Sequence, residues 1–197
     1  MTMPFKLGLT GSIGMGKSTT AAMFAAHSVP VWDADRAVHD LYAAGGAAVP
    51  SLAALFPGAV RNAAIDRAAL KSLIAADPTV LPRIEAIVHP LVAADRAAFV
   101  AQATAPLIVL DIPLLFETGL QTDMDATLLV TAPPQVQRAR VMARPGMTDA
   151  TFALLLSRQM PDADKRARAT HIVETLSLPL VESYVAALIA LLTSRHA

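Results

Sequence analysis

One segment near the start of the chain has the residue types and spacing of a phosphate-binding loop. Gly11–Ser18 reads GSIGMGKS and matches the pattern G-x-x-x-x-G-K-[ST] in full. Glycines let such a loop turn tightly and aim its N–H groups at phosphate oxygens, and a following helix adds partial positive charge. We expect Lys17 to reach the β- and γ-phosphates of a nucleotide and Ser18 to bind Mg²⁺. The alternative is a glycine-rich turn with a solvent-facing lysine.

The flanking residues fit the loop. An apolar run, Leu7–Thr10, predicts a strand before it, and Thr19–His27 predicts a helix after it. The residues expected to bind the nucleotide are Gly11, Ser12, Ile13, Gly14, Met15, Gly16, Lys17, Ser18 and Thr19. The motif by itself predicts only a nucleotide-phosphate binder, since GTPases, motor ATPases and small-molecule kinases share it.

Two acids follow the predicted strand Val29–Trp32. Asp33 is the candidate for the catalytic base, because in-line phosphoryl transfer needs a group that accepts or orients the acceptor hydroxyl's proton. Asp35 is two residues on, and in an extended segment its carboxylate would point to the same side and hold substrate or a magnesium-bound water. The alternative for either acid is that it caps a helix that starts near Arg36.

A third acid, Asp111, closes the apolar run Leu107–Asp111. This is the Walker-B pattern, which predicts a carboxylate near Mg²⁺. The alternative is an aspartate in a turn at the end of a strand. Because ligands of open α/β sheets bind at the carboxyl ends of the strands, we expect Asp33 and Asp111 to face the same crevice as the phosphate loop.

Two arginines are candidates for contacts to the transferred phosphate. Arg140 and Arg144 are four residues apart on a predicted helical pair, Pro134–Ala143 and Thr148–Met160, and should share one helix face. A lid that closes with both arginines over a triphosphate would stabilise transition-state charge and exclude water. The alternative is a solvated surface.

The order of the predicted elements indicates an α/β fold. The five predicted strands are Leu7–Thr10, Val29–Trp32, Leu107–Asp111, Ala126–Thr131 and His171–Val173. Helical stretches lie between them, which predicts a five-stranded parallel sheet flanked by helices. We expect a single domain over residues 1–197, with a helical substrate-binding insertion over 36–103 and a lid region over 134–165.

Composition excludes several classes of protein. There is no cysteine, so disulfides and thiolate chemistry are excluded. Sixteen acidic residues balance sixteen Lys plus Arg, so the formal net charge is zero. The chain therefore has no overall positive field that would attract nucleic acid or a membrane surface. Neither a signal peptide nor a membrane-spanning helix is indicated. We expect a cytoplasmic protein that binds small molecules, and no obligate protein partner is evident.

Several motifs together resemble the dephospho-CoA kinase family. Besides the phosphate loop, they are DAD at 33–35, EAIVHPL at 85–91, DIPLLFE at 111–117, Gln137–Arg144, and Arg158–Met160 with the basic pair Lys165-Arg166. They span nearly the whole chain in order. The family usually has Ala-Asp before its last strand and Asn shortly after it, whereas this chain has Thr170 and Thr175 in those regions.

The resemblance implies a P-loop kinase fold and ATP-dependent phosphorylation of the ribose 3′-hydroxyl of dephospho-CoA. The products are CoA and ADP, in the last step of coenzyme A biosynthesis, with ATP and Mg²⁺ bound. It implies catalytic roles for Asp33, Lys17 and Arg140, and metal binding by Ser18 and Asp111 as above. The candidate substrate contacts are Asp35, His89, Leu114, Phe116, Glu117 and Arg144.

Three other functions are considered for a chain with this phosphate loop. A GTPase switch is disfavoured, because the D-x-x-G spacing from Asp111 ends on Leu114. A kinase for another small acceptor, such as shikimate kinase, should carry a Gly-Gly-Gly segment, and this chain has only Gly45-Gly46. A nucleotide-binding regulatory protein without turnover would not need Asp33 as a proton acceptor.

Overall fold

The computed structural model describes residues 3–194, and these residues form two compact units. The sheet unit holds the described residues up to Trp32 and from Ala103 onward, and the helical unit is Asp33–Gln102. The helical unit nearly coincides with the insertion expected over 36–103. The interpretation of that insertion and of the region 134–165 as substrate site and lid stays a prediction, and residues 1–2 and 195–197 lie outside the described part.

The sheet unit is built on a parallel sheet of five strands in the order β2-β5-β1-β6-β7. The strands are β1 (Phe5–Thr10), β2 (Val31–Asp33), β5 (Leu107–Asp111), β6 (Ala126–Thr131) and β7 (His171–Glu174). The five predicted strands are confirmed, and their ends differ by two residues at most. Since the strands are parallel, β1, β5 and β6 end at the same edge, where Leu9 pairs with Asp111 and Leu128.

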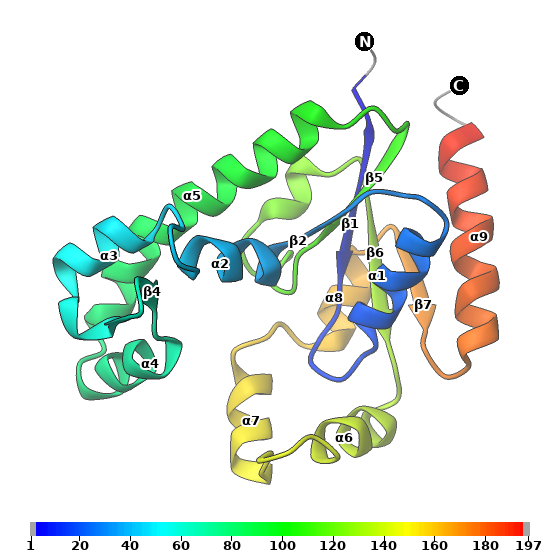
Figure 1. Cartoon of the computed structure of the whole chain (residues 1–197). Helices are drawn as coiled ribbons and strands as arrows, with labels where there is room; N and C mark the ends of the chain where they lie inside the picture. Colours follow the sequence, from blue (N-terminus) through cyan, green and yellow to red (C-terminus); the bar gives the residue numbers. More distant parts are fainter. Residues whose placement is uncertain (1–2, 195–197) are drawn as a thin grey trace. The chain divides into compact units, whose positions relative to one another are not determined.

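Five α-helices complete the described part of the sheet unit. They are α1 (Lys17–Ala26), α6 (Pro134–Met142), α7 (Asp149–Ser157), α8 (Asp162–Arg168) and α9 (Leu178–Ser194), with a short 3-10 turn, η2 (Leu120–Asp123). Helices α1 and α9 lie side by side (Figure 1) and pack on one face of the sheet. Among the described helices, none has the length and apolar character needed to cross a bilayer.

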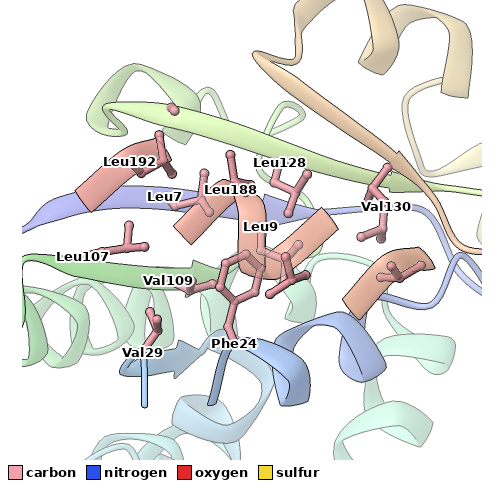
Figure 2. Packing of buried hydrophobic residues seen from close by; sticks show 14 of the residues in the cluster. Leu7, Leu9, Phe24, Val29, Leu107, Val109, Leu128, Val130, Leu188 and Leu192 are labelled. Carbon is pink, nitrogen blue, oxygen red and sulfur yellow. The ribbon is translucent and has the colours of Figure 1, made fainter. Parts of the chain in front are cut away.

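The pleat of the strands sorts residues between the two faces. Leu7 and Leu9 of β1 point into the core beneath α1 and α9, together with Phe24 and Leu188 (Figure 2). Gly8, between them in sequence, faces the other side of the sheet. A Cβ there would lie 2.9 Å from side-chain atoms of both Leu115 and Met124. Glycine therefore lets the segment after β5 lie directly on β1.

The helical unit has its own apolar core. Its elements are α2 (Ala34–Tyr42), α3 (Val49–Leu55), η1 (Pro57–Ala59), β3 (Val60–Arg61), β4 (Ala64–Ile65), α4 (Arg67–Ala76) and α5 (Val80–Gln102). Leu52, Leu70 and Ile84 are buried in this core. The helical insertion predicted over 36–103 did not include the β3–β4 hairpin. That hairpin turns at Asn62 and Ala63, which have φ of 52° and 59°.

Two leucines on α9 test the assigned core. Leu188 is 4% exposed and Leu191 is 40% exposed. We expect Leu188→Ala to lower the free energy of unfolding by about 2–5 kcal/mol, because it removes buried apolar surface and leaves a cavity. Leu191→Ala should change it by less than about 1 kcal/mol, since alanine favours helix at least as well as leucine. Equal losses in urea unfolding would contradict this packing of α9.

Candidate active site

The phosphate loop lies between β1 and α1 and is packed closely from two sides. Gly14 and Gly16 have φ of 78° and 91°, the left-handed region that favours glycine. A Cβ on Gly11 would lie 2.4 Å from Val130 Cγ2 of β6, and one on Gly14 would lie 2.5 Å from Val141 Cγ2 of α6. The loop therefore keeps its shape because β6 and α6 approach its backbone more closely than any larger residue allows.

The start of α1 presents main-chain donors at this loop. Gly16 is the N-cap residue, and within residues 3–194 no side chain caps it by a hydrogen bond. The first N–H groups of a helix have no partner inside the helix, so an anion beyond this end can accept from them. Ser18 and Thr19 lie in this first turn and are exposed.

Lys17 and Asp111, both predicted from sequence, are brought together. The Lys17 ammonium donates to Asp111 Oδ1 and forms an ion pair with it. The Asp111 side chain is only 2% exposed, and that of Lys17 is 15% exposed. The register that pairs Leu9 with Asp111 sets this carboxylate beside the entrance to the loop. A buried carboxylate needs a compensating cation, and Lys17 supplies it.

Arg140 also lies against the phosphate loop, and its present partners are protein groups. Its Nη1 donates to Thr175 Oγ1 at 2.8 Å and approaches the Gly14 carbonyl at 3.5 Å, while Nη2 donates to the Thr175 carbonyl. The Thr175 hydroxyl in turn donates to the Met15 carbonyl at 2.8 Å. Thr175, noted above as a departure from the family pattern, thus joins β7, the loop and α6.

The expectation that Arg144 shares a helix face with Arg140 is wrong. Helix α6 ends at Met142, and Arg144 lies beyond it in an exposed turn before Pro145. The reason is local, because proline disfavours the helical conformation of the residue before it. Arg138, by contrast, bridges the two helices of the predicted lid through an ion pair with Asp149.

The DIPLLFE segment after β5 is mostly buried. Phe116 is 3% exposed, and Leu114 is 39% exposed. Glu117 Oε1 accepts from the Met160 main-chain N–H at 2.8 Å and pairs with Lys165 Nζ at 2.9 Å. Lys165 is fully buried, so Glu117 anchors this segment to α8. Whether Leu114, Phe116 and Glu117 also contact substrate stays a prediction, as it does for Arg144.

The remaining predicted site residues belong to the helical unit. Asp33 is the N-cap of α2, and its Oδ1 accepts from the N–H groups of Asp35 and Arg36 at 2.8 and 3.0 Å. The helix begins at Ala34, so Asp35 is in its first turn, and the extended geometry assumed for the two acids is wrong. Asp33 does cap a helix, the alternative considered for it. His89 is exposed on α5, next to Pro90 within the helix.

The oxygen donors expected for Mg²⁺ are few. In the described residues, no group of three or more His, Cys, Asp or Glu side chains is arranged to hold a metal ion. Mg²⁺ in nucleotide sites is held by one or two carboxylates together with substrate phosphates and waters. Ser18, which follows Lys17 in sequence, and Asp111, which pairs with Lys17, lie in the same unit and are donors of the right chemistry for such a site.

Three polar side chains help to hold this site together, and none of them had a role predicted from the sequence. Gln137 and Gln159 both bond to the main chain of Ile13, and Lys165 compensates Glu117. All three lie in segments that carried the family resemblance, Gln137 in Gln137–Arg144, Gln159 in Arg158–Met160 and Lys165 in the pair at 165–166. For Gln137 and Lys165, which are buried on helices, the available signal was a polar residue on the buried face of a helix.

A parallel sheet with a complete G-x-x-x-x-G-K-S loop after β1, and an acid at the end of β5 paired with the loop's lysine, defines a nucleotide-binding protein of the P-loop class. The family model described as dephospho-CoA kinase matches residues 5–178. The chain belongs to the dephospho-CoA kinase family.

Curated relatives and solved structures agree with this assignment. The dephospho-CoA kinase of Cereibacter sphaeroides is 66% identical over 187 residues, 95% of either chain. That of a Jannaschia species is 62% identical, over 97% of this chain and 98% of its own. A crystal structure from Thermus thermophilus has a TM-score of 0.83 at 38% identity, covering 96% of this chain and 97% of the other. Dephospho-CoA kinase from Campylobacter jejuni, at 18% identity and a TM-score of 0.69, shares the fold.

The buried Glu117–Lys165 pair leads to a stability prediction. We expect Glu117→Ala to lower the free energy of unfolding by about 3–5 kcal/mol, because it leaves the Lys165 charge buried without a partner. Urea unfolding measures the loss, and the double variant Glu117→Leu with Lys165→Met should regain much of it.

The control is the exposed pair of Arg138 and Asp149, whose side chains are 57% and 70% exposed. Arg138→Ala should cost less than about 1 kcal/mol. A Glu117→Ala variant as stable as this control would show that the Lys165 charge does not depend on Glu117.

Proposed function

We propose that this enzyme transfers the γ-phosphoryl group of ATP to the ribose 3′-hydroxyl of dephospho-CoA and releases CoA and ADP. The observation that carries the proposal is the 66% identity, over 95% of either chain, to a curated dephospho-CoA kinase. The intact phosphate loop with its Lys17–Asp111 pair supports it, since a relative that had lost catalysis would not need to keep both. We further propose Mg²⁺ as the metal and the cytoplasm as the location.

In this proposal the sheet unit binds the nucleotide. The N–H groups at the start of α1 and the ammonium of Lys17 hold the β- and γ-phosphates, while Ser18 and Asp111 provide oxygens for Mg²⁺. The bound ion would neutralise charge on the phosphates. Lys17 then exchanges its present partner, Asp111, for phosphate oxygens. Arg140, whose guanidinium lies at the Gly14 carbonyl, is close enough to the loop to add positive charge there.

The acceptor is proposed to bind the insertion at 36–103, with Asp33 as the base. Both capping bonds of Asp33 go to Oδ1, which fixes the carboxylate. We infer that Oδ2 takes the proton of the 3′-hydroxyl as the phosphoryl group moves. Asp35 and His89 of the helical unit are proposed acceptor contacts, and so are Leu114, Phe116, Glu117 and Arg144 of the sheet unit.

The reaction itself is the first test. Purified protein with ATP, Mg²⁺ and dephospho-CoA should produce CoA, followed by chromatography, and EDTA should abolish the reaction. Adenosine, AMP and shikimate serve as parallel acceptors. Turnover of one of these in place of dephospho-CoA would overturn the proposed substrate, and ATP binding without any turnover would favour a regulatory protein.

The role of Asp33 is tested by Asp33→Asn. Asparagine caps helices as well as aspartate does, so α2 should remain intact while the proton acceptor is lost. We expect unchanged ATP affinity by calorimetry and a kcat lower by roughly 10²–10⁴-fold. Asp66→Asn is the matched control, because Asp66 caps α4 through bonds from Ala68 and Ala69 and has no proposed catalytic role. A near-normal kcat for Asp33→Asn would remove Asp33 as the base.

The role of Lys17 is tested by Lys17→Ala, with the exposed Lys71→Ala as control. We expect Lys17→Ala to weaken ATP binding, slow transfer, or both, because the variant loses the cation that holds the phosphates. Calorimetry and steady-state rates give the two effects separately, and thermal unfolding reports any loss of stability from removing the Lys17–Asp111 ion pair. ATP affinity and rates equal to the wild type would rule out the phosphate-loop assignment.

A further inference from the structure

One residue of the phosphate loop, Ile13, has both of its main-chain groups bound by glutamine side chains. Its N–H donates to Gln159 Oε1 at 3.1 Å, and its carbonyl accepts from Gln137 Nε2 at 2.8 Å. Phosphate loops hold their ligands through main-chain N–H groups, so the orientation of each peptide in the loop decides which donors face the phosphates. Two side chains fix that orientation at Ile13.

The two glutamines come from opposite ends of one segment. Gln137 is the fourth residue of α6 and is buried, with 7% of its surface exposed. Gln159 follows α7 and precedes α8. Its neighbour Met160 is held in turn by the N–H bond to Glu117, which pairs with the buried Lys165. The α6–α7 segment is thus tied to the same loop residue at both of its ends.

The residue after Ile13 is fixed by the same helix. A Cβ on Gly14 would lie 2.5 Å from Val141 Cγ2 and 3.1 Å from the Gln137 carbonyl oxygen. Helix α6 therefore contacts consecutive loop residues, through a hydrogen bond at Ile13 and through close packing at Gly14. The loop cannot change its shape here unless α6 moves as well.

We propose that Gln137 and Gln159 are positioning residues for ATP binding, which hold the Ile13 peptide so that the N–H groups from Gly14 onward face the phosphates. The inference rests on the proposed function in that ATP is taken as the ligand of the loop. The α6–α7 segment then has a second role besides that proposed for it as a lid. Its two ends, at Gln137 and Gln159, hold the phosphate loop directly.

The two amides act in opposite senses, which makes the proposal testable. Gln137 must donate, because a carbonyl only accepts, and Gln159 must accept, because an N–H only donates. Glutamate has nearly the size of glutamine but, when ionised, only accepts. Gln159→Glu therefore keeps the bond from Ile13, whereas Gln137→Glu places a carboxylate against the Ile13 carbonyl.

The experiment compares Gln137→Glu and Gln159→Glu with wild type by ATP calorimetry and by KM for ATP and kcat. We expect Gln137→Glu to weaken ATP binding about tenfold or more at pH 8, and Gln159→Glu to change it less than about threefold. Gln135→Glu, on the exposed side of α6, controls for the added charge. The loss should appear in KM for ATP more than in kcat, since neither glutamine is proposed to touch the reacting atoms.

A pH series separates positioning from general damage. Burial raises the pKa of a carboxyl group, and the carboxyl introduced by Gln137→Glu, once protonated, regains an O–H donor for the Ile13 carbonyl. The affinity ratio of Gln137→Glu to wild type should therefore recover as the pH falls from 8 toward 6, while the ratio for Gln135→Glu stays flat. A loss that does not respond to pH, or equal losses in Gln137→Glu and Gln159→Glu, would overturn the proposal.

If Gln137→Glu does not fold, Gln137→Leu replaces it, with Gln135→Leu as control. Gln137→Leu should weaken ATP binding several-fold while its thermal unfolding stays cooperative, and unchanged affinity would overturn the proposal. The calorimetric and unfolding readouts use ATP without acceptor, whereas KM and kcat need dephospho-CoA. A wild-type protein that binds ATP but does not convert dephospho-CoA would therefore contradict the proposed function and leave the test of the glutamines intact.

Discussion

The burial of a carboxylate at the end of an apolar strand constrains the whole nucleotide site. Asp111 closes β5, whose residues are all buried, and its charge has to be balanced without much help from water. Lys17 supplies the balancing charge from the first residue of α1. That pairing requires β1 and β5 to be neighbours in register and the loop between β1 and α1 to be short. The strand order, the loop and the start of α1 together bring this lysine beside this acid.

A second buried pair extends the same principle a few residues further on. Glu117 lies in the segment that follows Asp111 and pairs with Lys165 of α8. One oxygen, Glu117 Oε2, is buried without a hydrogen-bond partner among the described atoms, so the pair is costly to bury. Such a pair contributes little net stability compared with apolar residues. Separating the two charges is nevertheless strongly unfavourable, because each would then be buried without a compensating charge. The pair therefore fixes where α8 lies relative to the segment after β5.

The predicted positions of Asp35 and Arg144 were wrong for local physical reasons. The helix after β2 begins at Ala34 because Asp33 caps it, so Asp33 and Asp35 do not alternate as in a strand. Arg144 leaves the helix because Pro145 follows it, although spacing alone had put it on the face of Arg140. In both cases periodicity was applied one or two residues beyond the point where a cap or a proline changes the backbone.

The sequence by itself determined the sheet, the phosphate loop and the family. Buried parallel strands are continuous apolar runs, and the loop's chemistry is confined to eight consecutive residues, Gly11–Ser18, so both are visible locally. Tertiary structure alone decided which polar groups meet. The bonds of Gln137 and Gln159 to Ile13 join residues 124 and 146 positions apart, and the Arg140–Thr175 bond spans 35. No periodicity links such residues, because their pairing follows from the register of the sheet and the close approach that Gly11 and Gly14 permit.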